Sequence, residues 1–100
     1  MTTTEPMTTV TVKVTREDID NGVEGKCYSC PVALALKRVV FFARVDLDAI
    51  LIYGDADGHN EFNVDMPRPV ASFIFLFDAG LPASPFEFTI EVPARFVRAA

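Results

Sequence analysis

The segment Phe86-Glu-Phe-Thr-Ile-Glu-Val92, closed by Pro93, is the clearest strand in the chain. Its apolar side chains alternate with Glu and Thr, which is the two-residue period of a strand with one buried face. The same period recurs over residues 9–15, where Thr and Lys alternate with Val10, Val12 and Val14. Strands of this kind need a second layer over their apolar face, so we expect helices to pack against the sheet.

Two segments have the apolar spacing of helices. The first opens at Pro31 with Ser29 or Cys30 as its cap, and its inward stripe is Val32, Ala35, Leu36 and Val39. The second opens at Pro69 and ends at Gly80, with an inward stripe of Val70, Phe73, Ile74 and Phe77.

Shorter signals surround the first of these helices. Thr15-Arg-Glu-Asp18 has the form of a capping box and predicts one helical turn that ends at Asn21-Gly22. Lys37 and Arg38 are expected to point outward near the end of the helix that Pro31 opens, where cations complement the helix dipole.

The middle of the chain returns to a strand pattern. Val45 alternates with Asp46 and Asp48, and an apolar run at residues 50–53 follows. A turn cluster at residues 54–58 then leads into alternation through Phe62, Val64 and Met66. This pattern predicts at least a hairpin, and a second turn at Asp48-Ala49 would make it a three-stranded meander.

The fold class is therefore α+β, with an antiparallel sheet and two helices on one face. The order β-α-β-β-α-β matches the ferredoxin-like split βαβ, and the meander would add one strand. Residues 9–93 are expected to form a single domain, with tails at residues 1–8 and 94–100.

Composition limits the function classes. The 100 residues carry a net charge of −5, half of them are apolar and nine are Phe, which indicates one small folded domain rather than disorder. An acidic chain lacks the clustered Lys and Arg needed to bind nucleic acid directly. There is no secretory signal and no apolar run long enough to span a membrane, so we expect a cytoplasmic protein.

The negative charge is concentrated in one segment. Residues 46–65 have no Lys or Arg and a net charge of −6, whereas residues 1–45 sum to +1 and residues 66–100 to zero. Spaced carboxylates can imitate a phosphate backbone or dock on a Lys/Arg surface. A wet sheet face must also be polar, so solubility is the alternative explanation. The six carboxylates, expected to face a partner, are Asp46, Asp48, Asp55, Asp57, Glu61 and Asp65.

Cys27 and Cys30 form the sharpest local motif, a CxxC followed by Pro31. A thiol at a helix N-terminus suits redox chemistry, and a thiolate pair suits zinc, so a small redox or zinc-binding protein is an alternative. A structural zinc site needs four ligands, however, and the chain has one CxxC and a single histidine, His59. No catalytic constellation or cofactor motif accompanies these residues, and we expect neither an enzyme nor a cofactor.

Phe75 lies about opposite the inward stripe of its predicted helix. An outward Phe suggests contact with another chain, and a structural homodimer joined through Phe75 is a further hypothesis.

The stretch from Cys27 to Leu36, C-x-x-C-P-V-A-L-A-L, resembles a segment of small proteins encoded by bacteriophages and prophages. Three further stretches point the same way: Val14-Thr15-x-Glu17-Asp18-Ile19-x-x-Gly22, Phe73-Ile74-x-x-Phe77-Asp78-x-Gly80 and Pro85-Phe86-x-Phe88. The resemblance implies a phage origin and transfers no active-site residue. By analogy with anti-CRISPR proteins, we expect a non-enzymatic inhibitor that binds a basic surface of a host nucleic-acid-handling complex.

Overall fold

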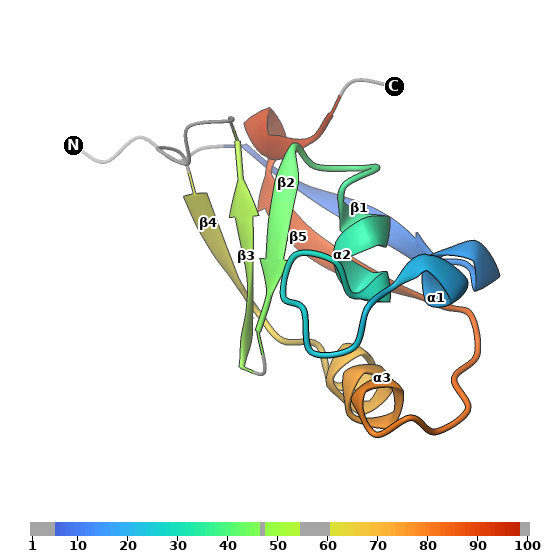
Figure 1. The fold of residues 1–100 in the computed structure, drawn as a ribbon. Coiled ribbons are helices and arrows are strands. Elements are labelled where there is room, and N and C mark those ends of the chain that lie inside the picture. The colour runs from blue at the N-terminus through green and yellow to red at the C-terminus, as the bar shows by residue number, and fades with distance from the viewer. Residues whose placement is uncertain (1–5, 47, 55–60, 99–100) are drawn as a thin grey trace.

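A computed structural model describes residues 6–46, 48–54 and 61–98 of the chain (Figure 1). It is an α+β fold whose described strands pair antiparallel in two small sheets. The elements follow one another as β1 (Met7–Val14), α1 (Arg16–Asn21), α2 (Pro31–Leu36), β2 (Phe42–Val45), β3 (Ala49–Tyr53), β4 (Glu61–Asp65), α3 (Arg68–Asp78), β5 (Phe86–Pro93) and a 3₁₀ turn (Ala94–Phe96).

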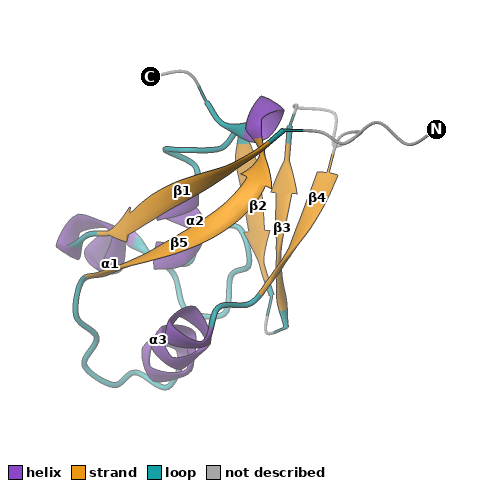
Figure 2. Cartoon of the chain, turned by 180° about the vertical axis from the view of Figure 1, so that it is seen from behind, coloured by secondary structure: helices purple, strands orange, loops and turns teal. Residues whose placement is uncertain are grey.

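The first sheet is a long two-stranded ribbon made from the two ends of the chain. β1 pairs with β5 along its whole length, from Met7 opposite Pro93 to Val14 opposite Phe86 (Figure 2). Side chains at alternate positions face the core, as the period predicted: Val12, Val14, Phe88, Ile90 and Val92 are all buried. β1 begins at Met7, two residues before the expected strand.

The second sheet is the three-stranded meander β2-β3-β4, so the additional turn and strand are present. Asp46 N–H donates to the carbonyl of Ala49 at 3.0 Å and closes the turn between β2 and β3. Ala43, Ile50 and Ile52 turn toward the core and are fully buried. The opposite face of the meander lies at the surface.

α2 lies between the two sheets and packs against both β1 and β2 (Figure 1). Cys30 caps it through its sulfur, which accepts from the N–H of Ala33 at 3.5 Å, and Pro31 is its first residue. Ala33, which is not part of the predicted inward stripe, is also fully buried, so α2 is buried on more than one side. A short helix buried on most sides is apolar around its circumference, which explains the PVALAL sequence.

Arg38 takes a role that the helix-dipole interpretation missed. Asp18 is only 4% exposed, and the guanidinium donates to both of its carboxylate oxygens, at 2.6 and 2.7 Å. Arg38 also donates to the backbone carbonyl of Lys13 at 2.7 Å. The predicted capping box at Thr15 is present, and Arg38 ties it to the end of α2.

α3 closes one end of the molecule, below the sheets in Figure 1. Its inward stripe is confirmed, since Val70, Phe73 and Ile74 are buried and Phe77 packs against the core. The ring of Phe73 lies 4.8 Å from that of Phe86, which joins the helix to β5. Gly80 follows with φ +74°, a left-handed conformation that suits glycine at the end of a helix.

The segment after Pro93 forms a 3₁₀ turn, although the sequence interpretation assigned it to a tail. Phe96 is 2% exposed and its ring lies 6.1 Å from that of Phe62 on β4. The N–H of Arg98 donates to the carbonyl of Val39 at 2.7 Å. Val40 and Val97 form an isolated antiparallel β-bridge. These contacts join residues 94–98 to β4 and to the segment between α2 and β2.

The division into two sheets differs from the expected single sheet covered on one face. The strands between α2 and α3 pair only with one another among the described residues. α2 packs between β1 and β2, whereas β4 lies next to β5 without pairing with it. The ferredoxin-like arrangement, which needs all of its strands in one sheet, is not shown.

Candidate protein-binding surface

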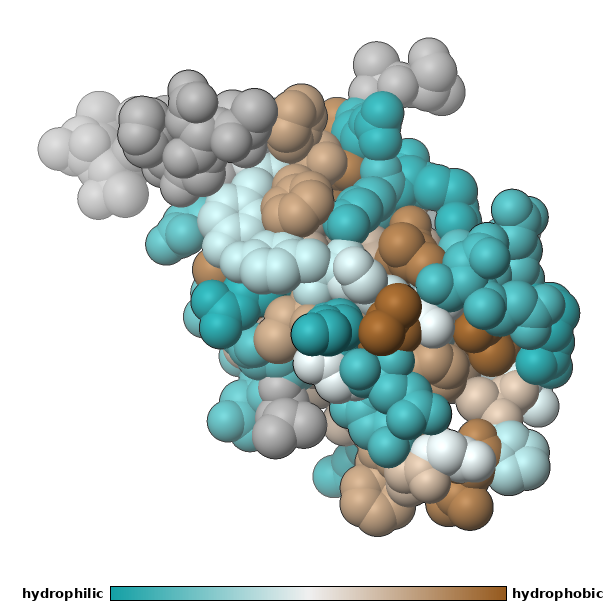
Figure 3. Space-filling model, in the orientation of Figure 1, coloured by the Kyte–Doolittle hydropathy of each residue, from teal (hydrophilic) through white to brown (hydrophobic). Residues whose placement is uncertain are grey.

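The solvent-facing side of the meander brings together side chains from three strands. Strand register sets Phe42 of β2 beside Tyr53 of β3, and Tyr53 beside Glu61 of β4. In the same way Arg44 lies beside Leu51, Leu51 beside Asn63, and Ala49 beside Asp65. We call this surface the meander face and define it by Phe42, Arg44, Leu51, Tyr53, Glu61, Asn63 and Asp65. Figure 3 views the molecule from this side, with apolar and weakly polar side chains gathered among hydrophilic ones.

Two aromatic rings of the meander face, Phe42 and Tyr53, form a cluster with Tyr28 from the adjacent loop. Tyr28, in the loop before α2, stacks on Phe42 with ring centroids 5.2 Å apart, and Phe42 lies 6.0 Å from Tyr53. Tyr28 is 41% exposed. Partial burial raises the pKa of Tyr53, and a side-chain hydrogen bond with Tyr28 raises it further. Partly exposed aromatic residues with a polar tip are the type enriched at protein interfaces.

Two cations lie on the same side as β2. The ammonium of Lys37 is 4.6 Å from the centre of the Phe42 ring and donates to the carbonyl of Tyr28 at 2.6 Å. Arg44 pairs with Asp46 at 3.2 Å, and the negative charge of Asp46 raises the pKa of Arg44. The positive charges of Lys37 and Arg44 thus lie on or beside β2, at one flank of the aromatic cluster.

The acidic residues form a border on the opposite flank. Glu61 and Asp65 are exposed at the two ends of β4, an edge strand of the meander, with exposed Asn63 between them. All three side chains project from the same side of the sheet. Across the meander face the charge therefore changes from positive at β2 to negative at β4.

The strand pattern that the sequence shows from Val45 through Asp46 and Asp48 does not continue as a strand, and the alternative of a turn at Asp48-Ala49 is the one observed. β2 ends at Val45 and β3 begins at Ala49, so both carboxylates are in the connecting turn, where Asp is favoured. Asp48 is exposed, but Asp46 accepts from Arg44 and from the Cys27 thiol, which lies 3.3 Å away. Of the predicted partner-binding acids that the structure describes, Asp46 is therefore the least available to an external cation.

Two further predicted partner-binding residues, Asp55 and Asp57, lie outside the described residues, as does His59. The acidic border described here consequently rests on Glu61 and Asp65, with Asp48 in the turn nearest to Asp65.

The two cysteines form no disulfide with each other. Burial raises the pKa of the Cys30 thiol, and the hydrogen bonds at its helix cap do not offset this. A redox nucleophile requires the opposite shift. Among the residues that the structure describes, no group of three or more His, Cys, Asp or Glu side chains is arranged to hold a metal ion.

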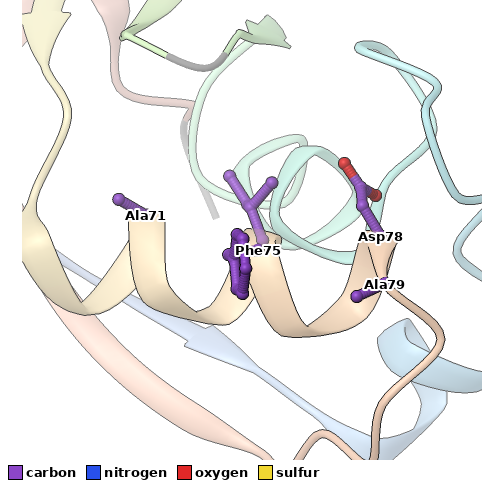
Figure 4. Close-up of a pocket in the computed structure, with 5 residues that line it drawn as sticks. Ala71, Phe75, Asp78 and Ala79 are labelled. Carbon is purple, nitrogen blue, oxygen red and sulfur yellow. The ribbon is translucent and has the colours of Figure 1, made fainter.

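Phe75 projects from the outer side of α3, as predicted, and is 73% exposed. Figure 4 shows Ala71, Phe75, Asp78 and Ala79 along this helix. With Ile74 they line a shallow hollow of about 390 Å³ beside the Phe75 ring. This outer surface of α3 is separate from the meander face.

Sequence reasoning found the acids and Phe75 but missed the aromatic cluster of Tyr28, Phe42 and Tyr53. Alternation marks Phe42 and Tyr53 as facing away from the buried Ala43 and Ile52. The pairing of β2 with β3 is what sets them side by side, and a loop contact adds Tyr28.

Comparison with family models, curated proteins and solved structures finds no match to this chain. In the described part of the chain, none of the helices has the length and apolar character that crossing a membrane requires.

Proposed function

We propose that this chain is a non-enzymatic protein-binding domain that docks through the meander face on an Arg- and Lys-bearing surface of a partner. The carrying observation is the position of Glu61 and Asp65, exposed along one edge of a face whose centre is aromatic. A guanidinium can stack on the Tyr53 ring while its charge pairs with Glu61, the neighbour of Tyr53 across the strands.

The aromatic rings and the carboxylates of this surface contribute to binding in different ways. Tyr28, Phe42 and Tyr53 supply apolar area in rings whose positions are already restricted by contact with one another, so little side-chain entropy is lost on docking. The carboxylates supply orientation and speed of association, because charges at the rim of an interface act mainly on the rate of encounter.

The partner class follows from the same charges. A protein surface rich in Arg and Lys that accepts a row of carboxylates is the kind that otherwise holds phosphates. We therefore propose an inhibitor of a host nucleic-acid-handling complex, in which the meander face occupies cations that the nucleic acid needs. The resemblance to phage and prophage proteins is consistent with this role.

The test is affinity capture from a host lysate with three baits: the natural chain, Glu61→Lys with Asp65→Lys, and a control with Glu87→Lys and Glu91→Lys. The control pair has the same four-residue spacing, lies exposed on β5 and changes the net charge equally. We expect the natural chain and the control to retain a partner that the β4 variant loses. Equal capture by all three baits would contradict the proposal.

A further inference from the structure

The outer surface of α3 has a charge order that opposes its own dipole. Arg68 is the first residue of the helix and Asp78 the last, and there is no acid in the first turn and no base in the last. Helix dipoles favour the reverse arrangement. The helix dipole therefore accounts for neither charge.

The two charges belong to one stripe. Positions 68, 71, 75 and 78 are three or four residues apart, so they follow one another along the same side of the helix. Between Arg68 and Asp78 this stripe carries only Ala71 and Phe75, with Ser72 and Ala79 beside them. The stripe is thus basic at one end, acidic at the other and uncharged in the middle.

In the middle of the stripe the exposed ring of Phe75 projects next to two hollows. Phe75 stands between the hollow of about 390 Å³ and a second hollow of about 460 Å³, which is lined by Ala71, Ser72, Phe75 and Leu76. Ala71 lines both hollows, one turn of helix from the ring. A large side chain beside a small one on the same helix is complementary to its own reversed copy.

We infer that α3 pairs antiparallel with α3 of a second copy of this chain about a two-fold axis. In the register that sets Arg68 against Asp78 of the partner subunit, Phe75 faces the partner subunit's Ala71. Each aromatic ring then covers the small residue of the other copy. This is the isologous, self-complementary form of contact that two-fold dimers use.

The same pairing resolves the charge order. Each Arg68 meets the carboxylate of the partner's Asp78, and the positive end of each helix dipole lies beside the negative end of the other. Within its own chain the carboxylate of Asp78 accepts from the N–H of Gly25 at 3.2 Å, which fixes it at the end of the helix.

The contact is small. A helix of 11 residues is about 16 Å long, which covers well under the ~800 Å² per partner of a typical stable complex. Exposed Leu76 and Leu81 near the end of α3 add apolar area. We therefore expect a weak, concentration-dependent dimer that leaves the meander face open.

Sedimentation velocity on the natural chain from about 10 μM to about 1 mM tests the pairing over the range where weak dimers form. We expect monomer at the low end and a growing dimer fraction above it. Phe75→Glu and Arg68→Asp should each weaken association at least tenfold. Combining Arg68→Asp with Asp78→Arg should restore it, because the charges then face each other in exchanged positions.

Two controls separate pairing from folding. Arg16→Asp makes the same change at the first residue of α1 and should leave association unchanged. Arg68→Asp should raise the melting temperature of the dilute monomer, because an acid suits a helix N-terminus, while association falls. A natural chain that stays monomeric throughout, or a dimer that survives Phe75→Glu, would overturn the inference.

Discussion

Replacing Arg38 by Met should destabilise the fold through a pair of charges far apart in the sequence. Met keeps most of the apolar stem and removes the guanidinium, which makes three hydrogen bonds: two to the carboxylate of Asp18 and one to the carbonyl of Lys13. The carboxylate left behind is 5% exposed and retains the hydrogen bond from the N–H of Thr15 at 2.9 Å.

The loss in free energy of unfolding depends on how exposed the Arg38 and Asp18 side chains are. An exposed pair contributes about 0–1 kcal/mol, whereas breaking a buried pair costs about 3–5 kcal/mol. The side chain of Arg38 is 50% exposed and that of Asp18 is 5% exposed, so the cost falls between these limits, at about 2 kcal/mol. For a domain of this size that lowers the melting temperature by roughly 8–16 °C.

The effect should depend on pH with a defined sign. Burial raises the pKa of Asp18, but the hydrogen bonds from Arg38 and Thr15 outweigh it and hold the pKa below its usual value of 3.8. A depressed folded-state pKa means that this stabilisation is complete above the unfolded pKa and is lost as pH falls through the folded one. The difference between the natural chain and Arg38→Met should therefore shrink below pH 3.8.

Urea unfolding followed by circular dichroism at pH 7 and at low pH measures both quantities. Asp18→Asn in a double-mutant cycle isolates the coupling, because the amide oxygen still accepts from Thr15. An Arg38→Met variant within about 0.5 kcal/mol of the natural chain at pH 7, a change typical of an ordinary surface site, would refute the reasoning.

Three other substitutions or reactions give equally direct results. Iodoacetamide at pH 8 should alkylate Cys27 in the native protein and reach Cys30 only after denaturation, because Cys30 is buried and burial raises the pKa of its thiol. Mass spectrometry counts the adducts, and a doubly labelled native protein would contradict this expectation. Gly22→Ala should cost about 2–3 kcal/mol in thermal unfolding, since an added Cβ would lie 2.5 Å from the ring of Pro31. Gly80→Ala should cost only about 1 kcal/mol, from its positive φ alone, and the reverse ranking of the two variants would count against the packing described.

The elements of this fold could be predicted because each has a local cause. The period of two in β1 and β5, the capping box at Thr15 and the apolar stripe of α3 all depend on residues a few positions apart. The face that each strand buries follows from the same patterns.

The partners of the strands could not be predicted, because alternation specifies a face and not a neighbour. Pairing of Met7 with Pro93 and the burial of α2 between two sheets depend on contacts across the whole chain. The ion pair of Asp18 with Arg38 has the same origin, since nothing in the local sequence relates the two side chains.

The candidate binding surface could also be predicted only in part from the sequence. The charge count located the acids, and helical spacing identified Phe75 as exposed. The Arg44 that pairs with Asp46 lies just before the segment counted as free of bases, so the net charge of −6 overstates the available acidity. Only the strand register reveals that aromatic rings stand between the cations and the exposed acids.

The most direct measurement of the central proposal is an NMR titration of the ¹⁵N-labelled chain with a basic peptide of about 12 Arg and Lys residues, at low and at high salt. The account predicts shift changes concentrated at Tyr53, Glu61, Asn63 and Asp65 that weaken steeply as salt is added. Changes spread evenly over all exposed carboxylates, including Glu87 and Glu91 on β5, would contradict it, because the peptide would then be responding to net charge and not to the meander face.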